Sequence, residues 1–194
     1  MEKRRSRTVL YLLDANVLIT AHNSYYPIDT VPEFWTWLVH KGQAGDLKIP
    51  LENYEEVKDG STDEEQDLLF AWVKREDVTE AILLDEAVEP NLVADVINNG
   101  YAPDLTDDET LQIGRDPFLM AYALASPANR CVVTTEVSAP SKRRQNRRIP
   151  DVCATMGVSC CNTFAMNKTL GFKTGWITKR ASAASSARAT RPNV

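Results

Sequence analysis

The chain has few side chains of the kinds that bind soft metals. It contains 2 histidines in 194 residues, and none of its 4 cysteines forms a Cys-x-x-Cys pair. Zinc sites are usually built from such groups, so a zinc centre is poorly supported. We expect the cysteines to be reduced and packed as small apolar residues. A metal site would therefore use oxygen ligands, which favour Mg²⁺ or Mn²⁺.

Long apolar runs and phosphate-binding glycine loops are also missing. No stretch approaches the roughly 20 apolar residues that a membrane span requires. The basic residues 1–7 are followed by too short an apolar run before Asp14 to form a signal peptide. We therefore expect a cytoplasmic protein without a membrane segment. No GxxxxGK loop is present, and a nucleophile paired with histidine has little support when His22 and His40 are the only candidates.

The net charge of −5 argues against a nucleic-acid partner until its distribution is considered. Residues 52–110 contain 19 Asp and Glu but only 3 Lys and Arg. The rest of the chain contains 8 acidic and 19 basic residues. The sequence thus predicts an acidic, solvated surface and a second surface able to attract phosphates.

Length and composition predict one domain with short tails. A chain of this length, 43% hydrophobic, can bury a sizeable core without disulfides. We expect a basic N-terminal tail at residues 1–7 and a folded domain at residues 8–178. Residues 179–194 are rich in Ala and Ser, and we expect a disordered tail there.

Short apolar segments alternate with helical patterns along the domain. Strands are expected at residues 8–13, 47–49, 81–84, 131–134 and 158–160. Helices are expected at residues 15–21, 31–42, 51–58, 62–75, 86–98, 118–125, 150–156 and 162–170. This alternation predicts an α/β fold with a parallel sheet of about five strands, covered by helices on both faces.

Acidic residues stand where such a fold would gather them. In an open parallel sheet, ligands bind outside the carboxyl ends of the strands. The candidate catalytic residues at strand ends, or on the helices beside them, are Asp14, Glu56, Asp116, Glu136 and Asp151. Carboxylates in one cleft repel one another unless a cation neutralises them or some take up protons. We expect Asp14, Asp116, Glu136 and Asp151 to bind Mg²⁺ or Mn²⁺, and one acid to orient an attacking water.

Each acid also has a plain structural interpretation. The three aspartates suit helix N-caps, and Glu136 has the weakest individual signal. The helix at residues 51–58 carries three candidate acids, any of which can be an exposed charge: Glu52, Glu55 and Glu56. The prediction therefore depends on the whole set.

A basic segment lies between two of these acids. Five positive charges fall within residues 142–148: Lys142, Arg143, Arg144, Arg147 and Arg148. Loops of this kind bind phosphate backbones without reading sequence, so we expect them to contact RNA. A solvated loop or a protein-binding segment is an equally good interpretation of the segment alone.

Several of these segments resemble motifs of PIN-domain ribonucleases. Residues 11–19, Tyr-Leu-Leu-Asp-Ala-Asn-Val-Leu-Ile, resemble the opening strand and turn of that family, with Asn16 two residues after Asp14. Residues 116–123 resemble its third acidic motif, and residues 132–136 a fourth that more often ends in Asp than in Glu136. Residues 54–58 and 149–153 resemble the segments that carry the helix Glu and the final acid.

The resemblance implies a Rossmann-like three-layer α/β/α fold, a divalent metal, RNA cleavage and dimerisation. Asn16 and Thr134 become supporting polar residues of the site. Among small bacterial members, VapC-like toxins are paired with an antitoxin, so a cognate antitoxin is an expected partner. Two departures from the family pattern are Glu136 in place of Asp and the long acidic segment at residues 60–110.

Two other functions remain open. The same fold can serve as an inactive module that binds RNA or protein, with its acids kept as helix caps. A phosphatase of the haloacid dehalogenase type is disfavoured, because that class has a second Asp where this chain has Asn16.

Overall fold

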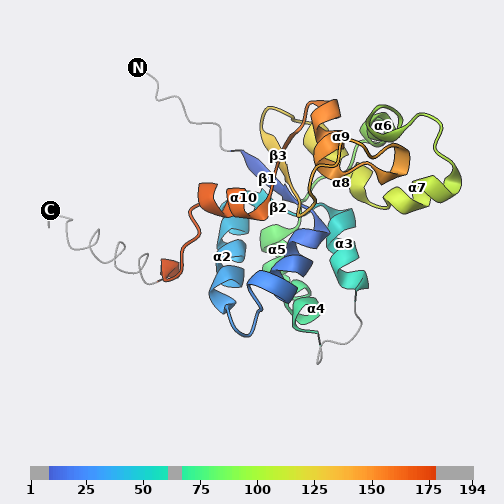
Figure 1. The fold of residues 1–194 in the computed structure, drawn as a ribbon. Helices are drawn as coiled ribbons and strands as arrows, with labels where there is room; N and C mark the ends of the chain where they lie inside the picture. The colour runs from blue at the N-terminus through green and yellow to red at the C-terminus, as the bar shows by residue number, and fades with distance from the viewer. Residues whose placement is uncertain (1–8, 61–66, 178–194) are drawn as a thin grey trace, which may run out of the picture.

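A parallel sheet forms the centre of the structure, a computed structural model that describes residues 9–60 and 67–177. Its four strands run parallel in the order β2-β1-β3-β4 (Figure 1). They are β1 (Leu10–Leu13), β2 (Leu47–Lys48), β3 (Arg130–Val133) and β4 (Ser159–Cys161). Leu12 lies opposite Lys48 on one side and Val132 on the other. Strand order reverses between β1 and β3, so these two central strands flank the crevice where open α/β sheets bind ligands.

The remaining described elements are helices and helical turns. The α-helices are α1 (Ala15–Thr20), α2 (Pro32–Gln43), α3 (Leu51–Asp59), α4 (Leu68–Val73), α5 (Glu76–Ile82), α6 (Pro90–Asp95), α7 (Asp107–Ile113), α8 (Asp116–Leu124), α9 (Ile149–Met156) and α10 (Thr163–Thr169). Three further turns are η1 (Ala21–Tyr25), η2 (Val96–Tyr101) and η3 (Arg144–Asn146).

Helices pack on both faces of the sheet because alternate strand residues face opposite ways. Leu13 and Val133 join one buried cluster, which also contains residues of α1 to α5 and α10. Leu12 and Val132 join the other, built from η2, α7, α8 and α9. Figure 1 shows these two groups of helices on opposite sides of the strands. The α/β class and the parallel sheet are confirmed, in a layout consistent with a Rossmann-like fold.

One predicted strand is wrong. Residues 81–84 were expected to add a fifth strand, but Ala81 and Ile82 form the end of α5. Only Leu83 makes a parallel bridge, to Ile49 beyond β2. An apolar run this short fits a buried helix end as well as a strand, and packing against α2 favours the helix.

The acidic segment also folds differently from its prediction. The expected helix at residues 62–75 falls partly on residues 61–66, outside the described part. Helix α4 begins after Asp67, whose side chain accepts a hydrogen bond from the backbone N–H of Phe70 at 2.9 Å. Helix α7 was not predicted, although Thr106 and Glu109 form a capping box at its start.

The expected tails at residues 1–7 and 179–194 also lie outside the described residues. Within residues 9–60 and 67–177, no helix is long and apolar enough to span a membrane. The four cysteines are free, and Cys131 and Cys153 are buried.

Candidate active site

Two polar side chains follow the central strands directly. Asp14 comes after β1 and Thr134 after β3. Neighbouring parallel strands end at the same edge, and the backbone N–H of Asp14 donates to the carbonyl of Val133 at 2.9 Å. The carboxyl end of the sheet therefore brings together residues that lie 120 positions apart in sequence.

The Asp14 carboxylate is buried and held by neighbouring donors. The hydroxyl of Thr134 donates to its Oδ2 at 2.8 Å, and the backbone N–H of Asn16 to its Oδ1 at 3.5 Å. The pKa of Asp14 is raised to about 6, mainly by burial. The hydrogen bond from Thr134 acts against this rise, and the charges of Glu56 and Glu136 add to it. Asp14 is thus both the N-cap of α1 and a member of an acidic group.

Asp116 has the most strongly raised pKa of the acids in this group. It begins α8, and the Tyr101 hydroxyl donates to its Oδ2 at 3.5 Å. Burial raises its pKa to about 8, followed by repulsion from Asp14, Glu136 and Glu56. Four predicted acids, from β1, α3, α8 and the loop after β3, therefore act on one another in a single crevice.

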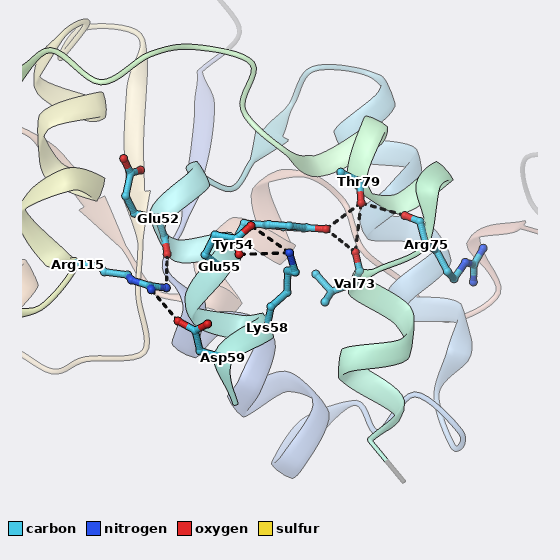
Figure 2. A network of polar contacts seen from close by, with 9 residues as sticks. All are labelled: Glu52, Tyr54, Glu55, Lys58, Asp59, Val73, Arg75, Thr79 and Arg115. Carbon is cyan, nitrogen blue, oxygen red and sulfur yellow. Dashed lines mark hydrogen bonds and ion pairs between the residues drawn. The ribbon is translucent and has the colours of Figure 1, made fainter. Parts of the chain in front are cut away.

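The three acids of α3 have different partners, and Figure 2 shows those around Glu52 and Glu55. The Glu55 carboxylate pairs with Lys58 at 3.1 Å. Glu52 instead interacts with Tyr122 and raises the pKa of its hydroxyl. Of the three acids, Glu56 is the one whose charge raises the pKa of both Asp14 and Asp116. Its own pKa is raised by burial and lowered by Arg115.

Arg115 was not predicted as a site residue, yet it ties α3 to α8. Its guanidinium donates to the backbone carbonyl of Glu52 at 2.9 Å and pairs with Asp59 at 2.6 Å (Figure 2). These contacts anchor the residue directly before Asp116 to the helix that carries Glu56. In the sequence, Arg115 stands out only as a positive charge shortly after the acidic stretch. Tyr101, which bonds Asp116, has no feature that marks it as a site residue.

Glu136 joins the acidic group but also has structural partners. Its Oε1 accepts from Arg148 at 2.9 Å, and its Oε2 accepts from the backbone N–H of Ile149 at 2.7 Å. The second contact satisfies an otherwise free donor at the start of α9. Its own backbone N–H donates to Thr134 Oγ1 at 3.2 Å, so Thr134 links Asp14 to Glu136.

The hydrogen bonds of Asp151 go to the loop after β3. Its carboxylate accepts hydrogen bonds from the Ser138 hydroxyl at 2.5 Å and from the backbone N–H of Ala139 at 2.7 Å. These bonds, with the charge of Arg147, lower its pKa, and none of the other four acids affects it. The structure thus gives Asp151 a role in holding the loop after β3.

The acidic group has the ligand atoms that a Mg²⁺ or Mn²⁺ site requires, but not the arrangement. Among the side chains of residues 9–60 and 67–177, no group of three or more His, Cys, Asp or Glu is arranged to hold a metal ion. The donor chemistry nevertheless fits Mg²⁺ or Mn²⁺, because the coupled side chains offer only oxygen. Their mutual repulsion, which raises the pKa of both Asp14 and Asp116, is the cost that a cation would relieve.

The predicted basic residues divide into two groups. A cavity of about 310 Å³ is lined by the acids Asp116 and Glu136 together with Lys142, Arg147 and Arg148. Arg144 is turned away to α7, where it pairs with Glu109 and Asp104, both at 2.7 Å. Arg143 donates to two backbone carbonyls of its own loop, those of Pro140 and Lys142. Positive charge therefore faces the acids from part of this segment.

Comparison with known families adds one result. Residues 11–174 match a family described as a domain of unknown function, DUF4411. The chain belongs to this family. No curated protein matches the chain. The DUF4411 region spans all five predicted acids and the basic segment, so the complete candidate site belongs to the family domain.

Proposed function

We propose that this DUF4411 protein is a metal-dependent endoribonuclease with a PIN-like site. The proposal is supported by four neighbouring acids at the carboxyl ends of β1 and β3: Asp14, Glu56, Asp116 and Glu136. Thr134 bonds both Asp14 and Glu136, and Asp116 lines one cavity with Glu56 and another with Glu136. Acids gathered in this way repel one another unless they take up protons or bind a cation. A hydrolase using Mg²⁺ or Mn²⁺ fits the cation case.

Each residue then has a definite task. Asp14 and Asp116 would be the main ligands, with Glu136 and Glu56 completing the negative charge. A bound divalent ion supplies a more acidic water and neutralises charge on the phosphodiester. Thr134 holds Asp14 and Glu136 in position through its hydroxyl. Lys142 and Arg148 line the same cavity as Asp116 and would bind the phosphate backbone there.

The biological setting we propose is that of a cytoplasmic bacterial toxin. It follows from the resemblance to small PIN-like proteins, and it implies a cognate antitoxin that covers the crevice and a homodimer. Production of the wild type alone is expected to arrest growth, while Asp14→Asn relieves the arrest. Equal growth with both proteins would count against the toxin role.

A second candidate function is an inactive binding module of the same fold. Two observations favour it. Glu136 already has two structural partners, and Asp151 accepts hydrogen bonds from the loop after β3. In this case the basic residues of the 142–148 segment still bind RNA, but no divalent metal ion binds.

Digestion of RNA with Mg²⁺, Mn²⁺ or a chelator tests the proposal. Asp116→Asn removes one negative charge with little change in shape. We expect it to reduce cleavage by at least about a hundredfold, a loss typical of removing a group that acts on the reacting atoms. The control is Asp29→Asn, because Asp29 is exposed on the loop before α2.

The outcomes separate the two candidates. Metal-dependent cleavage by the wild type and by Asp29→Asn, but not by Asp116→Asn, supports the nuclease. Binding of RNA without cleavage in any metal supports the module. Asp151→Asn is tested in the same assay: full loss of cleavage with an unchanged melting temperature would restore Asp151 to the site.

A further inference from the structure

A second cavity, of about 620 Å³, adjoins the acidic crevice. Thr134 and Glu136 line it on the side of the crevice, and Tyr25 and Phe164 line it elsewhere. Glu136 also lines the charged cavity that contains Asp116, so the two spaces meet at this residue. Its volume lies within the range of about 300–1,000 Å³ that is usual for small-ligand sites.

Two aromatic side chains from distant segments meet at this cavity. Tyr25 ends η1 and Phe164 lies in the first turn of α10. Their rings make an edge-to-face contact with centroids 5.1 Å apart. Tyr25 is 50% exposed and Phe164 51% exposed, so ring surface remains open to a ligand. Exposed aromatic rings of this kind stack on nucleobases whatever the base.

Polar residues also line the cavity. Thr135 and Asn162 form part of its wall beside the two rings. A nucleobase has an apolar face and polar edges, so it suits a lining that combines aromatic and polar residues.

The neighbouring charges favour an occupant that is joined to a phosphate. Lys142, Arg147 and Arg148 line the charged cavity together with Glu136. Arg148 also pairs with Glu136, and the Arg147 guanidinium donates to the backbone carbonyls of Gly100 and Asp151. A nucleotide whose phosphate lies among these groups can place its base in the aromatic cavity. Single-stranded RNA has this chemistry, because its bases are free to turn out and stack on aromatic side chains.

We propose that the cavity lined by Tyr25 and Phe164 is a nucleobase subsite for single-stranded RNA, next to the cleaved phosphodiester. The proposal deepens the ribonuclease function and rests on it. Stacking on the exposed ring surface positions the strand. No local sequence pattern marks this site, because Tyr25 and Phe164 are brought together only by the fold.

Binding of fluorescein-labelled RNA, measured by anisotropy, tests the subsite. The protein is the full chain carrying Asp116→Asn, so that bound RNA stays intact. The probes are short single-stranded homopolymers of each base, and the same strands with one abasic nucleotide placed at successive positions. Phe164→Leu is the main variant, because leucine keeps apolar surface but has no ring. Tyr25→Leu and Tyr25→Phe form a second pair, and Leu111→Ala is the control at another exposed apolar residue.

Loss of stacking is expected to weaken binding about tenfold. One abasic position should weaken binding to the parent protein by that factor. Phe164→Leu and Tyr25→Leu should each bind intact RNA about tenfold more weakly than the parent does. On the strand with that abasic position, the two variants should bind as well as the parent does. Tyr25→Phe and Leu111→Ala should bind like the parent. Melting curves that match the parent show that the variants are folded.

Other results overturn the proposal in distinguishable ways. If Phe164→Leu binds intact RNA like the parent, or loses affinity equally for intact and abasic strands, the subsite is wrong. If it is wrong while the wild type still cleaves RNA, the ribonuclease function stands. If the parent binds no RNA and the wild type cleaves none, both proposals fail. Parent-like RNA binding by Phe164→Leu, with self-association through this face in sedimentation, would assign the cavity to a second copy.

Discussion

At the scale of single residues, Thr134 connects the acids that the fold brings together. Its hydroxyl donates to Asp14 Oδ2 at 2.8 Å and accepts from the backbone N–H of Glu136 at 3.2 Å. Asp14 and Thr134 are each 1% exposed, so water does not replace these bonds easily. A buried carboxylate that loses a donor keeps the full cost of its desolvation.

Thr134→Val is therefore expected to lower the free energy of unfolding by about 1–3 kcal/mol and to reduce RNA cleavage. The hydrogen bond from Thr134 lowers the pKa of Asp14, so its loss should raise that pKa further. Urea unfolding and the cleavage assay measure the two effects. Thr36→Val is the matched control, because Thr36 is exposed and its hydroxyl donates to the carbonyl of Pro32 in its own helix. An equal effect of the two substitutions would show that Thr134 has no special role.

At the scale of elements, the close contact of α2 with α5 depends on one glycine. A Cβ atom on Gly42 would lie 2.5 Å from the carbonyl oxygen of Ala81, far inside van der Waals contact. Ala81 belongs to the segment that was predicted as a strand. The helix can end there because Gly42 lets it approach α2 closely, and Leu83 then bridges to Ile49.

Gly42→Ala is expected to destabilise the protein by about 1–3 kcal/mol, because backbone atoms cannot move aside as a flexible side chain does. Gly60→Ala is the control, since a Cβ there would meet its nearest neighbour, the carbonyl oxygen of Val57, at an ordinary 3.5 Å. Thermal unfolding compares the two variants. Tm values that are equally close to the wild type would contradict the close approach of the two helices.

At the scale of the whole molecule, the separated charges of the sequence meet in the fold. Arg144, from the basic segment, pairs with Asp104 and Glu109 of the acidic segment. This contact lowers the pKa of Glu109 to about 2. The acidic region around α7 is therefore packed against the basic loop as well as exposed to solvent. The crevice, by contrast, keeps acids that repel one another.

The free energy of unfolding of the metal-free protein is expected to fall between about pH 4 and pH 8. Burial and neighbouring acids raise the pKa of Asp116 from 3.8 to about 8, and that of Asp14 to about 6. A carboxyl group with a higher pKa in the folded state stabilises the fold below its unfolded pKa. That contribution is lost as the pH rises through the folded pKa. Urea unfolding in chelator at a series of pH values measures the decline.

Two comparisons check this pH dependence. Asp116→Asn has no ionisable group at this position, so its stability should fall less over the same range, while Asp29→Asn should follow the wild type. Mn²⁺ added at pH 8 should raise the wild-type stability by binding the folded state, and it should do so less in Asp116→Asn. Parallel pH curves for wild type and Asp116→Asn would contradict the raised pKa. The groups with lowered pKa, such as Glu109, act in the opposite direction, mainly below pH 4.

The sequence by itself determined the features that local patterns encode. An apolar run that ends at Asp14 marks a central strand and the start of α1, and Asp116-Pro117 marks the start of α8. The alternation of strands and helices was enough to predict a parallel sheet covered on both faces. These signals are local, because strand pleat, helix caps and proline geometry act within a few residues.

Contacts between distant segments appear only in the folded chain. Glu55 pairs with Lys58 and Asp151 accepts hydrogen bonds from the loop after β3, while Glu56 is the acid of α3 that we propose for the site. The tertiary structure also turned the end of residues 76–82 into helix where a strand was predicted. The physical reason is that charge repulsion, close packing and cavities depend on distances between segments far apart in the chain, which no local pattern records.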